Sequence, residues 1–337
     1  MILLATIALL TSIALGTPML ARPTLPFGVR VAAERANDPA ILSLRRLYIQ
    51  LVVLAAFGAA GVAVLFEPDV RATVVVLAMV DAAFYYVIHR RVRAVKRKEW
   101  WQAEHRHGVS IDTSLRTEPV RLPWPWLTPA VLIMLVTVVV GWQRSFEPAL
   151  AQAGVTLLIS VITLLGLRSR PEVDAARPKG SSRRYRIYLR GIARMNLSLI
   201  AAINLHLLAQ ALVQWGLVPR TSFWTAAPYV PLGLGVLAYA LWQFRVGPAG
   251  HRLPAEPGEE DEDTGLVQRD DDKYWFLAGM IYANRSDPAV LVHRRAGFFW
   301  TLNMGHPIAW VVVAALVTVA LLSGFGVIDL PERRSIF

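Results

Sequence analysis

Polar side chains interrupt two of the apolar stretches of this sequence, and their spacing is the first pointer to chemistry. Asp81, Tyr85 and His89 follow one another at intervals of four residues, so on a helix they share one face. His206 and Gln210 have the same spacing further along the chain. An ionised carboxylate at the centre of a membrane costs about 2.5–3.5 kcal/mol on insertion scales, so acidic residues there are enriched at functional sites.

Two interpretations of Asp81 follow from this cost. If Asp81 met His206 near the middle of a membrane, the two would form a proton- or cation-handling pair, as in coupled transporters. The alternative is a packing hydrogen bond made by a protonated Asp81, with no ion traffic. We expect Asn196 and Asn204, which carry neutral amides, to form hydrogen bonds between helices.

A second polar group lies towards the C-terminal end, where Asp270–Asp272 precede Asp287 and His293. Their spacing fits no standard pattern of metal ligands, and runs of Asp are usually helix caps or solvated residues. We therefore expect no metal and no cofactor.

Arg294 and Arg295, close to Trp300, have two candidate roles. They could hold a lipid headgroup or a phosphate, or they could anchor this segment at a membrane surface. The sequence contains no Ser–His–Asp set, phosphate loop, HExxH or GxGxxG pattern, so we do not expect an enzyme.

The elements that must position these residues are long apolar runs, which follow from a composition that is 55% hydrophobic over 337 residues. Eight runs of about 18 to 24 residues are each long enough to cross a hydrocarbon core of ~30 Å as a helix. We predict an all-α polytopic membrane protein with about eight transmembrane helices. The runs are Ile2–Leu20, Leu47–Phe66, Ala72–His89, Trp124–Trp142, Ala149–Leu167, Ile192–Trp215, Phe223–Phe244 and Pro307–Ile328.

The basic residues predict the orientation of these helices. Of the 35 Lys and Arg residues, 29 fall in the connections 21–46, 90–123, 168–191 and 245–306, which share one side if there are eight spans. That side is expected to be cytoplasmic, with both termini outside and the chain in the bacterial cell membrane. Anionic lipid of the inner leaflet is an expected partner. Nucleic acid is not, because the basic residues are divided among four short loops.

The first apolar run has no positively charged residue before it, unlike a secretory signal peptide. Its removal would also export the basic connections. We expect it to be retained as the first span.

The charge pattern divides the chain into four parts. Residues 1–246 are a seven-span region with basic cytoplasmic loops, and 247–269 are a Pro- and Gly-rich acidic linker that is expected to be disordered. Residues 270–306, here called the module, are predicted to be a helix over "KYWFLAGMIY" followed by a β-hairpin that turns near Ala296–Gly297. Residues 307–337 are the last span and an outside tail.

The module carries the pattern DD-x-YW-x3-G-x-IY-x-N-x2-DP-x3-V-x2-R-x-G-x3-TLN-x-G-x-P. This pattern resembles a family of bacterial membrane proteins known as domain of unknown function 5808. The "FGVRV" at Phe27–Val31 and the "DP" at Asp38–Pro39 resemble the segment that follows the first span in the same family. The residues that match are Asp271, Asp272, Tyr274, Trp275, Gly279, Tyr282, Asn284, Asp287, Pro288, Val292, Arg295, Gly297, Thr301, Asn303, Gly305 and Pro307.

The resemblance implies an architecture and no activity, although some relatives also resemble the immunity protein of a sporulation-delaying toxin system. Two functions are therefore carried forward. The first is a non-enzymatic regulatory, immunity-like or scaffolding protein with a cytoplasmic surface for a protein partner or for lipid. The alternative is a proton- or cation-coupled transporter or exporter that uses Asp81 and His206.

Overall fold

The computed structural model describes residues 2–66, 68–101, 107–108, 114–171, 173–259, 261–297 and 299–324. Within these ranges, seven helical segments are long and apolar enough to cross a membrane, so a mostly helical, membrane-like architecture is confirmed. The main helices are α1 (Ile2–Leu20), α2 (Pro39–Phe66), α3 (Val70–Lys98), α5 (Thr128–Gly141), α6 (Glu147–Leu167), α7 (Pro178–Gln214) and α9 (Tyr229–Val246).

Shorter elements complete the helical part of the chain. A turn of 3-10 helix (Trp124–Leu127) leads into α5, while α4 (Ser114–Thr117) and α8 (Ser222–Ala226) are one-turn helices. The eighth predicted span corresponds to α10 (Pro307–Gly324), whose apolar stretch Pro307–Leu322 is shorter than the other seven. The end of the predicted last span and the predicted outside tail lie outside the described residues.

The helix boundaries follow the capping signals in the sequence. α2 begins at Pro39, and the Asp38 carboxylate accepts a hydrogen bond from the Ala40 N–H at 2.9 Å, as an N-cap residue does. The Asp69 carboxylate caps α3 in the same way by accepting from the Ala72 N–H at 2.8 Å. Both helices therefore extend beyond their apolar runs.

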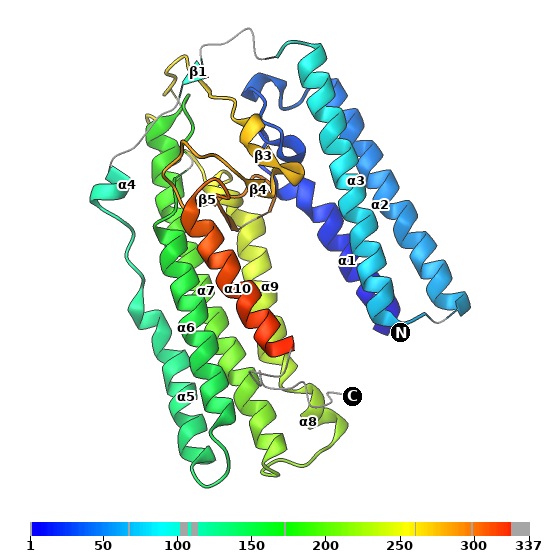
Figure 1. The fold of residues 1–337 in the computed structure, drawn as a ribbon, viewed down its shortest axis with the longest axis vertical. Coiled ribbons are helices and arrows are strands. Elements are labelled where there is room, and N and C mark those ends of the chain that lie inside the picture. Colours follow the sequence, from blue (N-terminus) through cyan, green and yellow to red (C-terminus); the bar gives the residue numbers. More distant parts are fainter. Residues whose placement is uncertain are drawn as a thin grey trace.

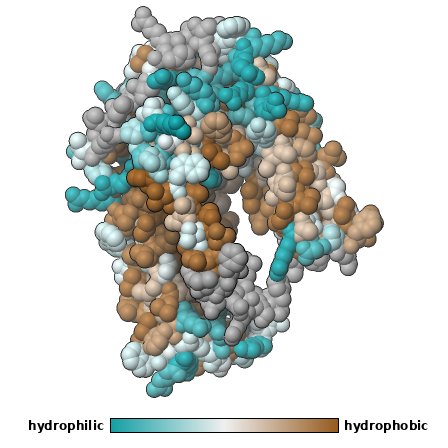
Figure 2. All heavy atoms as spheres, viewed as in Figure 1, coloured by the Kyte–Doolittle hydropathy of each residue, from teal (hydrophilic) through white to brown (hydrophobic). Residues whose placement is uncertain are grey.

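The long helices form two groups (Figure 1). The first bundle consists of α1, α2 and α3, which contact one another pairwise. The second bundle consists of α5, α6, α7 and α9, with α7 touching each of the others. The bundles lie close together at one end and diverge towards the other, where Figure 2 shows an opening between them.

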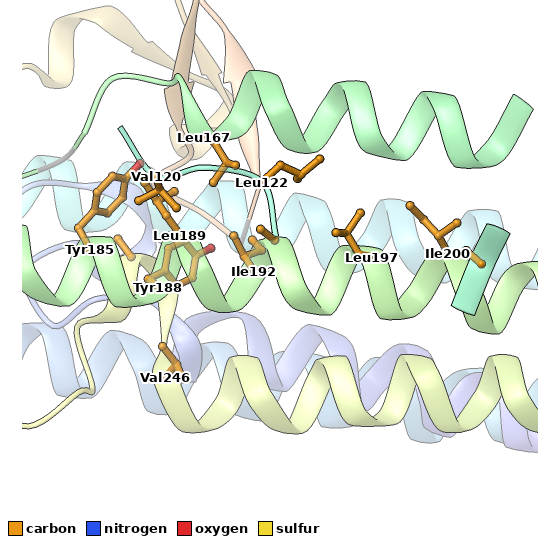
Figure 3. Close-up of a cluster of buried hydrophobic side chains, with 13 residues drawn as sticks. Val120, Leu122, Leu167, Tyr185, Tyr188, Leu189, Ile192, Leu197, Ile200 and Val246 are labelled. Carbon is orange, nitrogen blue, oxygen red and sulfur yellow. The ribbon is translucent and has the colours of Figure 1, made fainter. Parts of the chain in front are cut away.

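The second bundle is packed around α7. Figure 3 shows Tyr188, Ile192, Leu197 and Ile200 along this helix, with Leu167 of α6 facing them, and all five side chains are buried. Hydrogen bonds between helices add to this apolar packing.

The two asparagines of α7 supply such hydrogen bonds. The Asn196 amide donates to Thr163 Oγ1 at 2.9 Å, and the Asn204 amide donates to the Ala130 carbonyl and to Thr156 Oγ1, both at 3.1 Å. The predicted role of both asparagines between helices is confirmed.

Hydrophilic residues gather over the end where the bundles meet, and hydrophobic residues cover the sides of both bundles (Figure 2). The segments that follow α1, α3, α6 and α9 all lie at that end (Figure 1). Within 247–269, predicted from composition to be disordered, the described residues contact α7. The Glu262 carboxylate accepts from the Lys179 and Gly180 N–H groups at 3.0 and 3.1 Å, which places an anion at the N-terminus of α7.

The module consists of short strands and 3-10 turns. β3 (Trp275–Phe276) pairs antiparallel with β4 (Ile281–Tyr282), and β5 (Leu291–His293) pairs antiparallel with β6 (Trp300–Leu302). Just before the module, β2 (Val267–Gln268) pairs in parallel with β1 (His107–Gly108). The predicted hairpin is confirmed as β5 and β6.

The predicted helix over residues 273–282 is wrong. Leu277, Ala278 and Gly279 have φ values of +45°, +56° and +85°, which no right-handed helix contains. These left-handed residues turn the chain so that the backbone at Gly279 meets the segment after α1. A tertiary contact has overridden a favourable local helix pattern.

Candidate functional site

The module lies between the hydrophilic ends of the two bundles (Figure 1) and contacts both of them. Its first half, up to Tyr282, faces the first bundle together with Arg295. Its hairpin faces α6 and α7. The first contact is made by charged side chains and the second mostly by aromatic ones.

The contact with the first bundle is a cluster of six charges, here called the aspartate cluster: Asp270, Asp271, Asp272, Arg30, Lys96 and Arg295. Lys96, at the end of α3, places its Nζ 2.9 Å from Asp270 Oδ2 and 2.6 Å from Asp272 Oδ2. The Arg295 guanidinium bridges Asp271 and Asp272. Three acids and three bases compensate one another, which is the condition under which buried charges are tolerated.

Arg30 completes the cluster from the segment after α1. Its backbone N–H donates to Asp272 Oδ1 at 3.1 Å, and its Nε donates to Asp271 Oδ1 at 3.2 Å. Arg295, only 3% exposed, also donates to the Gly28 carbonyl at 3.0 Å and lies 5.1 Å from the ring centre of Trp275. The Arg295 side chain does not face a lipid surface, because it is buried and its two Nη groups donate inside the protein.

The cluster sets the charge state of Asp272. Burial by itself would raise the pKa of this carboxyl group, but the positive charges of Arg295 and Lys96 and their hydrogen bonds outweigh burial. The pKa of Asp272 is therefore held well below its ordinary value. The group stays ionised at any pH near neutrality, so the contact is ionic under all ordinary conditions.

Two glycines let the backbones meet at this contact. Gly28 has a φ of +77°, and a Cβ there would lie 2.3 Å from the Ala278 carbonyl oxygen. Gly279 has a φ of +85°, and a Cβ there would lie 2.8 Å from Arg295 Cβ. A side chain at Gly28 would push the module off the first bundle, whereas one at Gly279 would displace Arg295 within the module. His89 of α3 contacts the same segment after α1, with its Nδ1 2.8 Å from the Phe27 carbonyl oxygen.

The contact with the second bundle is mostly aromatic. The ring of Trp300 lies against Gly166 of α6, where a Cβ would come within 2.8 Å of the ring. His293 Nε2 is 3.4 Å from the Tyr188 hydroxyl of α7. One ion pair accompanies these contacts: Arg170, just after α6, pairs with Asp287 of the module.

Asn303 is the centre of the hydrogen bonds within the hairpin half of the module. Its buried amide donates to the carbonyl oxygens of Asn284, Asp287 and Ala289 at 2.9–3.1 Å, and its Oδ1 accepts from the N–H groups of Asn284 and Gly305. A Cβ at Gly305 would lie 2.4 Å from the Asn284 carbonyl carbon. Asn303 and Gly305 thus fix the turn that carries Asp287.

The other residues of the sequence pattern have structural places. The Tyr282 hydroxyl donates to Asp287 Oδ2 at 2.9 Å, and Tyr274 packs edge-on against Tyr282 at 6.4 Å between ring centres. Gly297 has a φ of +88° in the hairpin loop, and Thr301 pairs with Val292 across the hairpin. Pro288 follows Asp287 in the same turn, and Pro307 begins α10.

The intramembrane polar candidates are not brought together. Asp81, Tyr85 and His89 lie on α3 in the first bundle, whereas His206 and Gln210 lie on α7 in the second (Figure 1). His206 Nδ1 is 2.8 Å from the Pro228 carbonyl oxygen, and Gln210 lies 3.5 Å from the Tyr229 hydroxyl. The hypothesis of an Asp81–His206 pair therefore has no geometric basis.

Sequence analysis missed the partners of the module. Lys96 and Arg170 were counted only as part of a basic charge bias, and Arg30 only as part of "FGVRV". The Asp270–Asp272 run could have indicated these partners. Three adjacent acids need basic residues as partners once they are buried, and the chain is rich in Lys and Arg. Among the described residues, no group of three or more His, Cys, Asp or Glu side chains is arranged to hold a metal ion.

Fold and site together define a class of protein: a mostly helical, membrane-like protein with a polar module docked between two helix bundles. Residues 285–310 match a family of unknown function (DUF5808), so the chain is similar to that family over the Asp287 turn, the hairpin and the start of α10. No curated protein and no solved structure matches the chain.

Proposed function

We propose that this is a non-enzymatic protein of the bacterial cell membrane in which the module couples the two bundles from the cytoplasmic side. The observation that carries the proposal is that one short segment contacts both bundles: Asp270 and Asp272 pair with Lys96 of the first, and Trp300 lies on Gly166 of the second. A partner that pulls on the module would change how the bundles sit relative to each other. Such coupling suits a regulatory, immunity-like or scaffolding role.

The proposal includes no catalytic step. The carboxylates of Asp270, Asp271 and Asp272 are engaged by basic side chains, and Asp287 is engaged by Arg170 and Tyr282. Their chemistry is used to hold the module in place. The surface offered to a protein partner is the hydrophilic end, which combines the module with the basic connections (Figure 2).

The orientation in the membrane can be tested because the chain has no cysteine. Gln143→Cys, in the turn after α5, and Asp261→Cys, in the linker, each place a single thiol at an exposed position on opposite ends of the bundle. In intact cells, a membrane-impermeant maleimide is expected to label Cys at 143 and to label Cys at 261 only after permeabilisation. The reverse pattern would contradict the proposed placement, with both termini outside.

The coupling itself can be tested by the distance between the bundles. Spin labels at Leu54→Cys in α2 and Leu150→Cys in α6 stand on exposed, lipid-facing sides. We expect one narrow distance distribution, and a broad one when Arg295→Met releases the module from the first bundle. An unchanged distribution in that variant would show that the module does not hold the bundles together. Arg294→Met, a neighbouring change outside the aspartate cluster, is the control.

A second candidate function, ion-coupled transport, now depends on the first bundle alone. Asp81 is 8% exposed, and its Oδ1 has no hydrogen-bond partner among the described residues; the same is true of the buried Tyr85 hydroxyl. An unpaired buried carboxylate in a membrane span is a candidate ion-handling group. Asp81→Asn with normal membrane insertion is expected to abolish a transport or resistance phenotype; an intact phenotype would remove this candidate.

A further inference from the structure

Four arginines gather around a cavity that lies apart from the aspartate cluster. Arg186, Arg190 and Arg194 are spaced by four residues on α7 and so share one face of the helix. Arg121, from the segment between α4 and α5, lines the same cavity, whose volume is about 530 Å³. In the sequence, two predicted spans separate Arg121 from the other three arginines, and only the fold brings the four together.

The cavity lies at the level of lipid headgroups. α7 has 37 residues, whereas about 20 are enough to cross the hydrocarbon core, so its N-terminal turns project beyond the core. The guanidinium carbon of Arg194 lies 5.8 Å from the ring centre of Trp126, a residue type that is enriched where headgroups meet acyl chains.

The positive charge of three of these arginines is not neutralised by any residue that the structure describes. Arg121, Arg190 and Arg194 have no carboxylate within ion-pairing distance in the described parts of the chain. Glu118, at the edge of the cavity, contributes its backbone carbonyl, which accepts a hydrogen bond from Arg186 Nη1 at 3.1 Å. In the aspartate cluster, by contrast, every base has an acid. Arginines held this close together and uncompensated are an anion site.

An apolar cavity adjoins the arginines. Pro119 and Val120 line both cavities, so the two meet at this segment. The second cavity has a volume of about 740 Å³ and is lined by Leu165 of α6 and by Ile308 and Val312 of α10, whose side chains are half-buried or exposed on the membrane-facing part of the bundle. A soluble anion would make no contact with this apolar cavity, whereas the glycerol and the first methylene groups of a lipid would pack in it.

We propose that this pair of cavities is a binding site for an anionic phospholipid. The phosphate lies among Arg121, Arg190 and Arg194, and the start of an acyl chain lies in the apolar cavity beside α6 and α10. The arginine cavity contains no module residue, whereas Leu291 and Leu302 of the module and Arg170 also line the apolar cavity. Variants of the arginines therefore test lipid binding without changing the module contacts, so failure of this proposal can be distinguished from failure of the coupling role. Only the choice of the inner leaflet rests on the proposed orientation.

The test uses the full chain in detergent, with bound lipid counted by native mass spectrometry during titration with phosphatidylglycerol, phosphatidylcholine or inorganic phosphate. The wild type is expected to retain phosphatidylglycerol in preference to phosphatidylcholine. Arg190→Gln with Arg194→Gln is expected to weaken phosphatidylglycerol binding on the order of thirtyfold, since each basic residue near the membrane surface contributes about a factor of five. Arg97→Gln, an exposed arginine at the same end of the molecule on α3, is the matched control and is expected to change nothing.

Arg121→Gln provides a second variant in an extended segment, where the loss of a charge does not disturb a helix. It is expected to weaken binding by itself. Equal losses in Arg97→Gln and in the double variant would mean that only net charge matters and would overturn the proposal. Inorganic phosphate competing as well as the lipid would assign the arginines to a soluble anion, and equal retention of phosphatidylcholine would exclude recognition of negative charge.

Discussion

The two bundles hold the same module by different interactions. Towards the first bundle, the aspartate cluster sets three acids against three bases, and Arg295 is almost completely buried among them. Towards the second bundle, the main contact is the Trp300 ring on Gly166, and the accompanying Arg170–Asp287 pair has an arginine that is 38% exposed. The first contact is specified by charge and the second by shape.

This difference predicts how each contact can be broken. Removing any one charge from a buried, compensated ionic cluster destabilises the protein, because a charge of the opposite sign is then left unpaired. An aromatic ring on a glycine tolerates smaller rings but no added side-chain atom on the helix. The two contacts can therefore be broken separately.

Arg295→Met should have the largest effect. It leaves Asp271 and Asp272 partly unpaired inside the protein, which costs about 3–5 kcal/mol for a buried charge cluster. The measurement is denaturant unfolding in detergent, followed by tryptophan fluorescence, since Trp275 lies directly beneath the guanidinium. Arg294→Met is the control, and an equal loss of stability in that variant would show that the cluster contributes nothing specific.

Gly166→Ala should break the second contact at a cost of about 1–3 kcal/mol, because the new methyl group lies 2.8 Å from the Trp300 ring and must displace it. Gly154→Ala is a matched control in the same helix, because nothing lies within 4 Å of its Cβ position. That control should be neutral or slightly stabilising. Adding Trp300→Phe to Gly166→Ala should restore part of the loss; no restoration would mean that the clash lies elsewhere.

Acidification should weaken the first contact and leave the second largely intact. The pKa of Asp272 is depressed in the folded protein, so its contribution to stability is complete above the unfolded pKa of about 3.9 and is lost as the pH falls through the lower folded value. In Asp272→Asn, the melting temperature should depend less steeply on pH below about pH 4. An unchanged acid slope in Asp272→Asn would contradict an ionic first contact.

A second acid-sensitive group titrates in a separate window. Burial lowers the pKa of His251 to about 4, so the folded protein resists protonation of this ring. Stability should therefore fall between the unfolded pKa of about 6.5 and pH 4, above the range in which Asp272 titrates. His251→Gln should remove this upper slope alone, which separates it from the effect of Asp272 in the same melting series.

The helices were predictable from the sequence because the signal that defines them is local. The first apolar run and α1 have the same bounds, Ile2–Leu20, and α2 contains the whole of the run Leu47–Phe66. The grouping of helices was not predictable, since hydropathy does not record which faces meet. Asp81 and His206 both lie near the middle of their predicted spans, but the two spans belong to different bundles.

The site was predictable only in part, for the same reason. The hairpin follows from a local alternation and turn, whereas the Lys96–Asp270 pair joins residues 174 positions apart. The helix predicted over residues 273–282 failed because Gly279 and its neighbours adopt conformations that only the contact with Gly28 explains. Burial of a charged residue is a property of the fold, and it decides which acids become part of a site.

Tyr188→Phe should have the smallest effect and sharpens the comparison further. It removes only the hydroxyl that lies 3.4 Å from His293, and a typical hydrogen bond contributes about 0.5–1.5 kcal/mol net, with long bonds at the low end. Tyr86→Phe, on the exposed side of α3, is the matched control for loss of a hydroxyl. If Tyr188→Phe cost as much as Gly166→Ala, the second contact would depend on a polar group after all, and the contrast between charge on one bundle and shape on the other would no longer hold.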